Sequence, residues 1–133
     1  MNEFPLVQVF LMSYNRPEYI EEALRSVFAQ DYPNFEVILS DNSTTDHVFD
    51  LVRSRFSNEL LLNSENIEAT TLQPNLKKKR SLSIRRRRPS LSVLDHHNQI
   101  ISEVTAPYFM MFHDDDVLQP TALTQMMNTF APD

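Results

Sequence analysis

Glycine is absent from this chain of 133 residues, although average usage of about 7% would place roughly nine in that length. The Walker loop and the dinucleotide-binding fingerprint both need glycines, because backbone amides must approach a phosphate closely. Both classes of nucleotide site are therefore excluded, and any bound diphosphate must be held largely by a metal ion and side chains. Turns with positive φ fall to Asn and Asp, as expected here at Asp41-Asn42 and Asn63.

Cysteine is also absent, which excludes disulfides, thiolate zinc sites and cysteine nucleophiles. Any metal ion must therefore be bound by oxygen or imidazole. The apolar stretch near the N-terminus is about eight residues long with Gln8 inside it, too short for a signal peptide or a membrane span. We therefore expect a cytoplasmic protein, with peripheral association at the inner face of the membrane as a further option.

Charge is distributed unevenly along the chain. With 41% hydrophobic residues, the length fits one domain over residues 1–133. The net charge is −6, yet eight of the twelve basic residues lie in the basic segment, Lys77 to Arg88. An acidic body with one cationic segment can attract phosphates, an anionic membrane surface or its own acidic face.

Hydrophobic periodicity predicts alternating strands and helices. Apolar runs predict central strands, covered on both faces, at Leu6 to Ser13, Phe35 to Ser40 and Tyr108 to Phe112, and a short strand at Leu60 to Leu62. Helical spacing predicts helices that begin after Asn15, Asp46 and Ser90, and a last one at Pro120 to Phe130. Asn15 and Asp46 are the expected caps. The order implies a Rossmann-like, doubly wound, mainly parallel α/β sheet, with an irregular basic loop at residues 63–89.

The clearest functional signal lies in Tyr108 to Asp116, where an apolar strand ends in His113, Asp114, Asp115 and Asp116. Three adjacent carboxylates repel one another, and a protein that fixes them at a strand end usually offsets the repulsion by binding a hard cation such as Mg²⁺ or Mn²⁺. The carboxyl end of a strand in an open α/β sheet is also where ligands bind. An acidic loop or a helix cap is the alternative for the same residues.

Most of the chain resembles a known family, through PLVQVFLMSYNRPEYIEEALRSVFAQDYPNFEVILSDNSTTD and the later HDDD. These segments are similar to the donor-binding half of family 2 glycosyltransferases, inverting enzymes with the A-type glycosyltransferase fold. Four elements occur in the family's order: the strand ending in Ser13 to Pro17, the helix ending at residues 29–33, the strand followed by residues 41–46, and the acidic strand end. The resemblance implies a domain that binds a nucleotide-sugar, commonly a uridine one, for transfer to an acceptor hydroxyl.

The resemblance also implies site residues. Ser13, Tyr14 and Asn15 match the loop that cradles the nucleoside. Asp41 matches the first of two aspartates that bind the base or ribose, and Asn42 replaces the second with an amide that still accepts and donates. The nucleotide-sugar-binding set implied in this way is Ser13, Tyr14, Asn15, Asp41, Asn42, Arg88, Asn98 and Asp114.

The acidic cluster matches the family's Asp-any-Asp element in two possible registers. In one, His113 takes the place of the first aspartate and Asp115 that of the second, followed by Asp116. In the other, the pair is Asp114 and Asp116. We expect Asp115 to be a direct ligand of Mg²⁺ or Mn²⁺, because alternate strand residues share a face and His113 and Asp115 would point together. A hydrogen-bonded structural role is the alternative for His113. The ion would stabilise the charge of the leaving diphosphate.

The family's acceptor-binding segment and general base lie well after the acidic strand, and this chain ends at Asp133. We therefore expect an incomplete catalytic domain that binds donor and metal without transferring sugar. In the full enzyme the acceptor is a saccharide or is lipid-linked. Apolar surface that the absent half would cover favours self-association.

The competing hypothesis is a non-catalytic interaction or nucleic-acid-binding module that uses the basic segment, Lys77 to Arg88. Clustered cations attract phosphate, but no aromatic residues are interleaved for base stacking, so nucleic acid is not the expected partner. An inactive family relative kept as an interaction module is a third hypothesis. Of the remaining histidines, we expect His97 on the apolar face of its helix, and His47 and His96 exposed.

Overall fold

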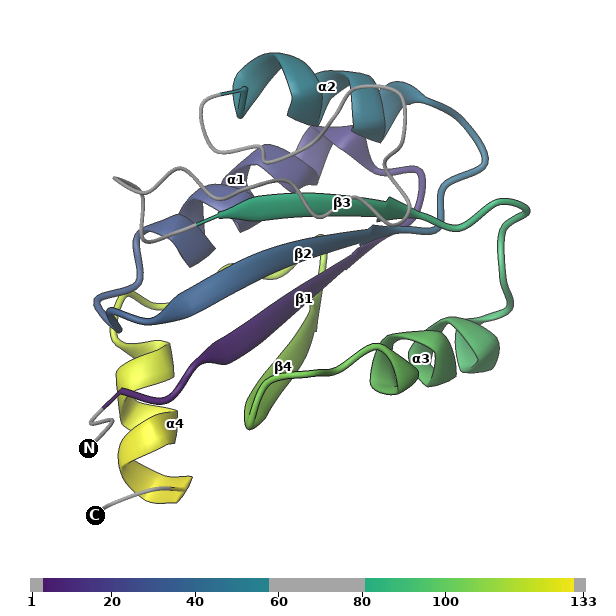
Figure 1. Ribbon diagram of the computed structural model, residues 1–133. Helices are drawn as coiled ribbons and strands as arrows, with labels where there is room; N and C mark the ends of the chain where they lie inside the picture. Colours follow the sequence, from purple (N-terminus) through teal and green to yellow (C-terminus); the bar gives the residue numbers. More distant parts are fainter. Residues whose placement is uncertain (1–3, 58–80, 131–133) are drawn as a thin grey trace.

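A four-stranded parallel sheet organises the molecule, and the computed structural model describes residues 4–57 and 81–130 (Figure 1). The strand order is β3-β2-β1-β4. The elements in chain order are β1 Val7–Ser13, α1 Pro17–Phe28, β2 Phe35–Asp41, α2 His47–Arg55, β3 Leu82–Arg86, α3 Val93–Ser102, β4 Tyr108–His113 and α4 Ala122–Phe130. The predicted mainly parallel, doubly wound α/β fold is confirmed, and so are the strands and helices expected within the described residues.

The sheet register brings three strand ends together. All seven residues of β1 are buried, as expected for a central strand. In the register, Ser13 lies beside Asp41 of β2, and Met12 lies beside His113 of β4. The carboxyl ends of β1, β2 and β4 therefore meet at one edge of the sheet, where ligands bind in open α/β folds.

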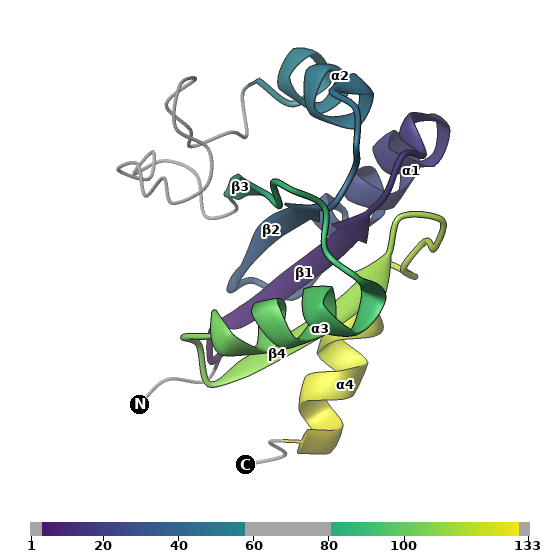
Figure 2. The ribbon, with the colours of Figure 1, turned by 90° about the vertical axis from the view of Figure 1, so that its right-hand side faces the viewer.

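Helices cover the two faces of the sheet unequally. Alternation along β1 turns Val9 and Leu11 into the larger core, which also holds buried side chains of α1, α2 and α4. Phe10 and Met12 face the opposite side and form a smaller cluster with Ile38 and Ile100, the latter from α3. Figures 1 and 2 both show α3 on the side of the sheet away from α1 and α2. None of the described helices, the longest of which has 12 residues, has the length and hydropathy to span a bilayer.

Strand β4 is more exposed than its sequence suggests. The apolar run Tyr108 to Phe112 predicts a strand covered on both faces, but β4 is an edge strand with a largely half-buried pattern. Phe109 is 41% exposed, although its ring packs edge-on against Phe10. The composition of the run resembles that of a central strand because it contains no polar residue before His113. Periodicity alone does not distinguish the two positions.

The turn between β1 and α1 differs from the prediction that Asn15 caps the helix. The N-cap is Arg16, without a side-chain cap hydrogen bond, and Asn15 precedes it with a φ of 55°. Asn15 is the one residue of the described ranges with positive φ, so the expected strain is not at Asp41-Asn42, and Asn63 lies outside those ranges. The Asn15 amide instead bonds both the backbone N–H and the hydroxyl of Thr44. Asn tolerates this conformation because its short polar side chain can bond locally.

The second half of the basic segment is ordered rather than irregular. Strand β3 lies inside the predicted loop at residues 63–89, whereas the strand expected at residues 60–62 and the basic run at residues 77–80 lie outside the described residues. Leu82 and Ile84 are fully buried on one face of β3. The basic side chains that follow have partners: Arg85 and Arg87 contact Glu103, at the C-terminal end of α3. The run of charges therefore conceals a strand whose cations are neutralised within the protein.

Helix α3 is rotated relative to the sequence-based expectation. His96 is 6% exposed and faces the sheet, where its ring bonds Ser40, so the expected exposure of His96 is wrong. His96 and Ile100 stand four residues apart and form the buried stripe of the helix. Leu94 and Ile101 of the same helix, although apolar, are 69% and 51% exposed.

Candidate functional site

A cavity of about 490 Å³ opens at the shared edge where β1, β2 and β4 end. Its residues come from the segment after β1, from the loop after β2, from residues 90–93 with the first turns of α3, and from the end of β4. Its lining includes Ser13, Tyr14, Arg16, Asn42, His113 and Asp114. Polar groups from four segments distant in sequence therefore converge on one space large enough for a small ligand.

The acidic cluster is organised around one arginine. Asp114 is 1% exposed, and its Oδ2 accepts a hydrogen bond of 3.1 Å from the backbone N–H of Tyr14. Arg16 Nη2 lies 2.7 Å from Asp114 Oδ1, and Arg16 Nη1 lies 3.3 Å from Asp115 Oδ2. The charge of Asp114 raises the pKa of Arg16. Asp116 is exposed, and its backbone N–H bonds the carbonyl of His113 to form a turn.

The turn changes which acid faces the cavity. Because β4 ends at His113, the strand alternation that would pair His113 with Asp115 does not continue beyond it. His113 and Asp114 line the cavity, whereas the side chain of Asp115 is 45% exposed at its edge. The ring of His113 also lies 6.2 Å, centroid to centroid, from the ring of His97.

The acidic cluster offers two carboxylates, rather than a complete set of protein ligands, to a divalent ion. Within residues 4–57 and 81–130, no group of three His, Asp or Glu side chains is arranged to hold a metal. Asp114 Oδ1, however, is buried and makes no hydrogen bond, although it is in ion contact with Arg16. Mg²⁺ is commonly bound by one or two carboxylates and completed by substrate phosphates. Asp114 and Asp115, on either side of Arg16, fit a site of that kind.

Hydrogen bonds connect the end of β1 to the loop after β2. The Ser13 hydroxyl donates to Asp41 Oδ1 at 2.9 Å, and the backbone N–H of Ser43 donates to the same oxygen at 3.2 Å. Burial raises the pKa of Asp41, and the hydrogen bonds from Ser43 and Ser13 oppose it in part. Asp41 is 2% exposed and is not among the lining residues, whereas Tyr14, 51% exposed, lines the cavity directly. The structure therefore places Asp41 as a support of the loops that form the cavity wall.

The Asn42 side chain hydrogen-bonds the segment that precedes α3, on the other side of the cavity. Its Nδ2 donates to the Leu91 carbonyl at 2.9 Å, and its Oδ1 accepts from the Leu91 N–H at 2.7 Å. The Ser90 hydroxyl bonds the Asn42 backbone carbonyl, just after the cis Arg88–Pro89 peptide bond. A carboxylate cannot donate the first of these bonds. The Asn42 amide therefore holds the segment leading into α3.

Four of the predicted donor-site residues do not line the cavity: Asn15 and Asp41, which bond the loops beside it, and Arg88 and Asn98. Arg88 is 43% exposed and contacts Asp46, which also contacts Arg86. Asn98 is exposed on α3 and is not among the lining residues. The predictions for Arg88 and Asn98 placed the side chains by sequence position, which does not reveal the direction in which they point.

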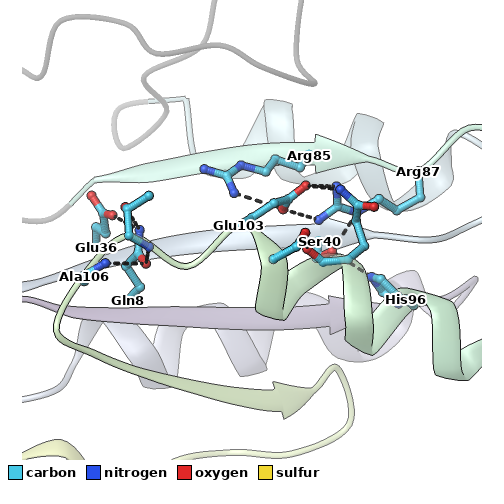
Figure 3. A network of polar contacts seen from close by, with 11 residues as sticks. Gln8, Glu36, Ser40, Arg85, Arg87, His96, Glu103 and Ala106 are labelled. Carbon is cyan, nitrogen blue, oxygen red and sulfur yellow. Dashed lines mark hydrogen bonds and ion pairs between the residues drawn. The ribbon is translucent and has the colours of Figure 1, made fainter.

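A buried polar network adjoins the cavity through His96, and no sequence motif predicts it. Figure 3 shows Arg87 between Glu103 and Ser40, with the ring of His96 on the far side of Ser40. Arg87 Nε donates to Ser40 Oγ at 3.1 Å, and both its terminal nitrogens bond Glu103, at 2.8 and 2.7 Å. Ser40 Oγ lies 2.7 Å from His96 Nε2. Since Ser40 accepts from Arg87, its own hydrogen is free to be donated to His96.

The network keeps His96 neutral. Burial, together with the nearby charge of Arg87, lowers the pKa of His96 to about 4. A neutral ring is consistent with Nε2 acting as an acceptor for Ser40. The neighbouring His97 bonds the Val93 carbonyl through Nδ1, which must therefore carry the hydrogen, and it lines the cavity as His96 does. Arg16, His96 and His97 are among the lining residues that sequence reasoning missed. Only the alternation of Leu82, Ile84 and the arginines could have pointed to the buried network.

Comparisons with known proteins agree with this geometry. The family model described as glycosyl transferase family 2 matches residues 8–133. The poly(ribitol-phosphate) beta-N-acetylglucosaminyltransferase TarS of Staphylococcus aureus is 29% identical over 115 residues, which cover 83% of this chain and 20% of TarS. The putative teichuronic acid biosynthesis glycosyltransferase TuaG of Bacillus subtilis is 41% identical over 49 residues, 37% of this chain and 19% of TuaG.

Solved structures show the same fold. The crystal structure of S. aureus TarS in complex with UDP has a TM-score of 0.69 at 19% identity, over 95% of this chain and 32% of that chain. The mannosyltransferase PcManGT from Pyrobaculum calidifontis, in complex with GDP-Man and Mn²⁺, has a TM-score of 0.63 at 21% identity, over 85% of this chain and 28% of that chain. This chain thus spans no more than a third of the length of any of these relatives.

Proposed function

This chain belongs to glycosyltransferase family 2 and has the A-type glycosyltransferase fold, and on that premise we propose that it binds the nucleotide-sugar donor of a sugar-transfer reaction. The observation that carries the proposal is the convergence of Tyr14, Asn42, His113 and Asp114 on one cavity at the carboxyl edge of the sheet. TarS has been solved with UDP and with UDP-GlcNAc, which supports a uridine nucleotide as the donor.

Each part of the cavity has a role in this proposal. The exposed ring of Tyr14 contacts the nucleoside, and Ser13 and Asp41 hold the Tyr14 segment in place. Asp114 and Asp115 hold Mg²⁺ or Mn²⁺, as the Mn²⁺ complex of PcManGT supports. The ion supplies charge neutralisation to the diphosphate leaving group. Inversion also requires a base that takes the proton of the acceptor hydroxyl, and its location beyond the acidic strand stays a prediction.

Calorimetric titration with UDP tests the proposal directly. We expect the chain to bind UDP more tightly with Mn²⁺ than without it. Asp115→Asn changes a half-exposed carboxylate and should reduce the Mn²⁺-dependent gain without unfolding the protein. Asp114→Asn should abolish that gain. Asp50→Asn, at an exposed position on α2, is the matched control and should leave it unchanged.

Two results would count against this function. The first is the absence of UDP binding by the folded chain in the presence of Mn²⁺. The second is binding that is identical with and without Mn²⁺ in the unmodified chain and in both acidic variants. Circular dichroism of each variant establishes that the protein is folded before its affinity is compared.

The described part of the basic segment does not favour the competing nucleic-acid function. Arg85 and Arg87 contact Glu103, and Arg86 and Arg88 contact Asp46. Arg87, which is only 8% exposed, is a poor phosphate-binding group, because binding would require a nearly buried ion pair to break. The basic run at residues 77–80 lies outside the described residues.

A further inference from the structure

Arg16 lies between two carboxylates of the acidic cluster, those of Asp114 and Asp115. It stands at the N-cap of α1, directly after the Asn15 turn, and its two terminal nitrogens contact different carboxylates. The contact with Asp114 is 2.7 Å and that with Asp115 is 3.3 Å. One guanidinium therefore bridges the same two carboxylates that fit a divalent ion.

The two ends of this bridge differ in their solvation. Asp114 is almost completely buried, and its described partners are Arg16 and the backbone N–H of Tyr14. A buried carboxylate needs a nearby positive charge, because removing the partner leaves an uncompensated charge in the interior. The Arg16 side chain itself is 42% exposed and lines the cavity. The guanidinium can therefore leave Asp114 for water or a cavity ligand, provided that another cation takes its place.

Two cations cannot share this cluster without strong repulsion. A divalent ion bound between Asp114 and Asp115 would lie within a few ångströms of a guanidinium in its present place, and like charges at that range oppose binding strongly. A nucleoside diphosphate in the same cavity changes the balance, because its anionic oxygens attract both the ion and the displaced guanidinium. Arg16 therefore lowers the affinity for the ion alone and raises the affinity for the ion together with the nucleotide.

We propose that Arg16 is a displaceable internal counter-ion, a positioning residue that neutralises Asp114 and Asp115 while the cavity is empty and makes tight binding of the metal ion depend on the nucleotide. The inference rests on the proposed donor-binding function. It predicts thermodynamic coupling: UDP raises the affinity for Mn²⁺, and by linkage Mn²⁺ raises the affinity for UDP by the same factor. Removal of Arg16 reduces this factor by improving the binding of Mn²⁺ alone.

The experiment measures Mn²⁺ affinity of the full chain by electron paramagnetic resonance of the free ion, with and without UDP. We expect Arg16→Gln to bind bare Mn²⁺ about tenfold more tightly than the unmodified chain, since a positive charge next to the site has been removed. Its Mn²⁺–UDP coupling factor should fall by at least the same amount. A purely structural role of Arg16 would lower the affinity for Mn²⁺ in both conditions.

Two further variants make the test decisive. Arg55→Gln is the matched control, because Arg55 also lies 3.2 Å from a carboxylate, that of Glu21, away from the cavity, and it should change nothing. Arg16→Lys keeps the charge but contacts one carboxylate at a time, and it should raise the affinity for bare Mn²⁺ by about threefold. If Arg16→Gln does not fold, Arg16→Lys carries the test.

The outcomes separate this inference from the proposed function. If the folded Arg16 variants bind bare Mn²⁺ no more tightly than the unmodified chain, the inference is overturned even where UDP binds with Mn²⁺. If no form of the chain binds UDP, the proposed function and the nucleotide dependence both fail, and a gain in affinity for bare Mn²⁺ in Arg16→Gln would then support only the neutralisation of Asp114 and Asp115 by Arg16.

Discussion

Replacing Glu103 with Gln should destabilise the fold strongly, although Glu103 lies outside the cavity. Glu103 accepts hydrogen bonds from Arg85 at 3.0 Å and from both terminal nitrogens of Arg87, at 2.8 and 2.7 Å. Arg87 is 8% exposed, so loss of the carboxylate leaves a nearly buried cation without its counter-charge. Breaking such a pair costs about 3–5 kcal/mol. Because Gln retains one acceptor oxygen and the volume of Glu, we expect the lower end, about 3 kcal/mol.

The lowered pKa of Glu103 expresses the same contacts and gives a similar magnitude. Burial would raise it, but the hydrogen bonds from Arg87, Gln99 and Arg85 and the charge of Arg87 outweigh burial and lower the pKa to about 2. A carboxyl with a depressed folded-state pKa stabilises the protein above its usual value of 4.5 and loses that contribution as the pH falls from 4.5 to about 2. The shift corresponds to about 3 kcal/mol.

Urea unfolding followed by circular dichroism measures the effect, and Glu21 supplies the control. Glu21 also contacts two arginines, Arg25 and Arg55, but on the surface of α1. At pH 7 the unfolding midpoint of Glu103→Gln should fall by about 1.5 M urea for a slope of about 2 kcal/mol/M. Glu21→Gln should leave the midpoint nearly unchanged, because exposed ion pairs contribute little. Equal midpoints for the two variants, or a Glu103→Gln deficit that persists at pH 2, would refute the reasoning.

Three further predictions concern the cavity and its support. The folded-state pKa of His96 is lowered to about 4 from 6.5, so the unfolded chain binds a proton at a higher pH than the folded one. The stability of the fold should therefore decrease as the pH drops from 6.5 to 4. Melting temperatures measured over this range should depend less on pH for His96→Gln than for the unmodified chain. Asn42→Asp removes the donor to the Leu91 carbonyl and places a carboxylate against it, so urea unfolding should show a loss of about 1–3 kcal/mol, in contrast to the exposed Asn98→Asp. Tyr14→Ala should weaken UDP binding several-fold in calorimetry while leaving the melting temperature unchanged, because the side chain is half exposed.

Several features of the fold and cavity follow from the sequence because they depend on local pattern. Apolar runs without interruption mark β1 and β2, and the parallel order follows from the helix between them. The carboxyl edge of the sheet then brings the segments after Ser13, Asp41 and His113 together. These rules depend on short-range pattern, and the resemblance to a family adds the class of ligand that we expect without changing them.

The remaining features depend on pairings between distant side chains. Arg16 and Asp114 are separated by 98 positions, and nothing in either segment indicates their contact. In α3, apolar residues occur on more than one side, so helical spacing alone did not distinguish His96 from His97 as the buried ring. The arginines at residues 85–88 look like a solvated run because their carboxylate partners, Asp46 and Glu103, lie in other segments.

The left-handed turn at Asn15 has a consequence for the stiffness of the cavity wall. A glycine would accept the same φ, but it would carry no amide to reach Thr44, and the unfolded chain would gain rotational freedom that folding must then remove. In this chain without glycine, the residue that reverses the backbone also hydrogen-bonds the neighbouring loop. The segments that follow β1 and β2 are therefore held in their relative positions before a ligand binds.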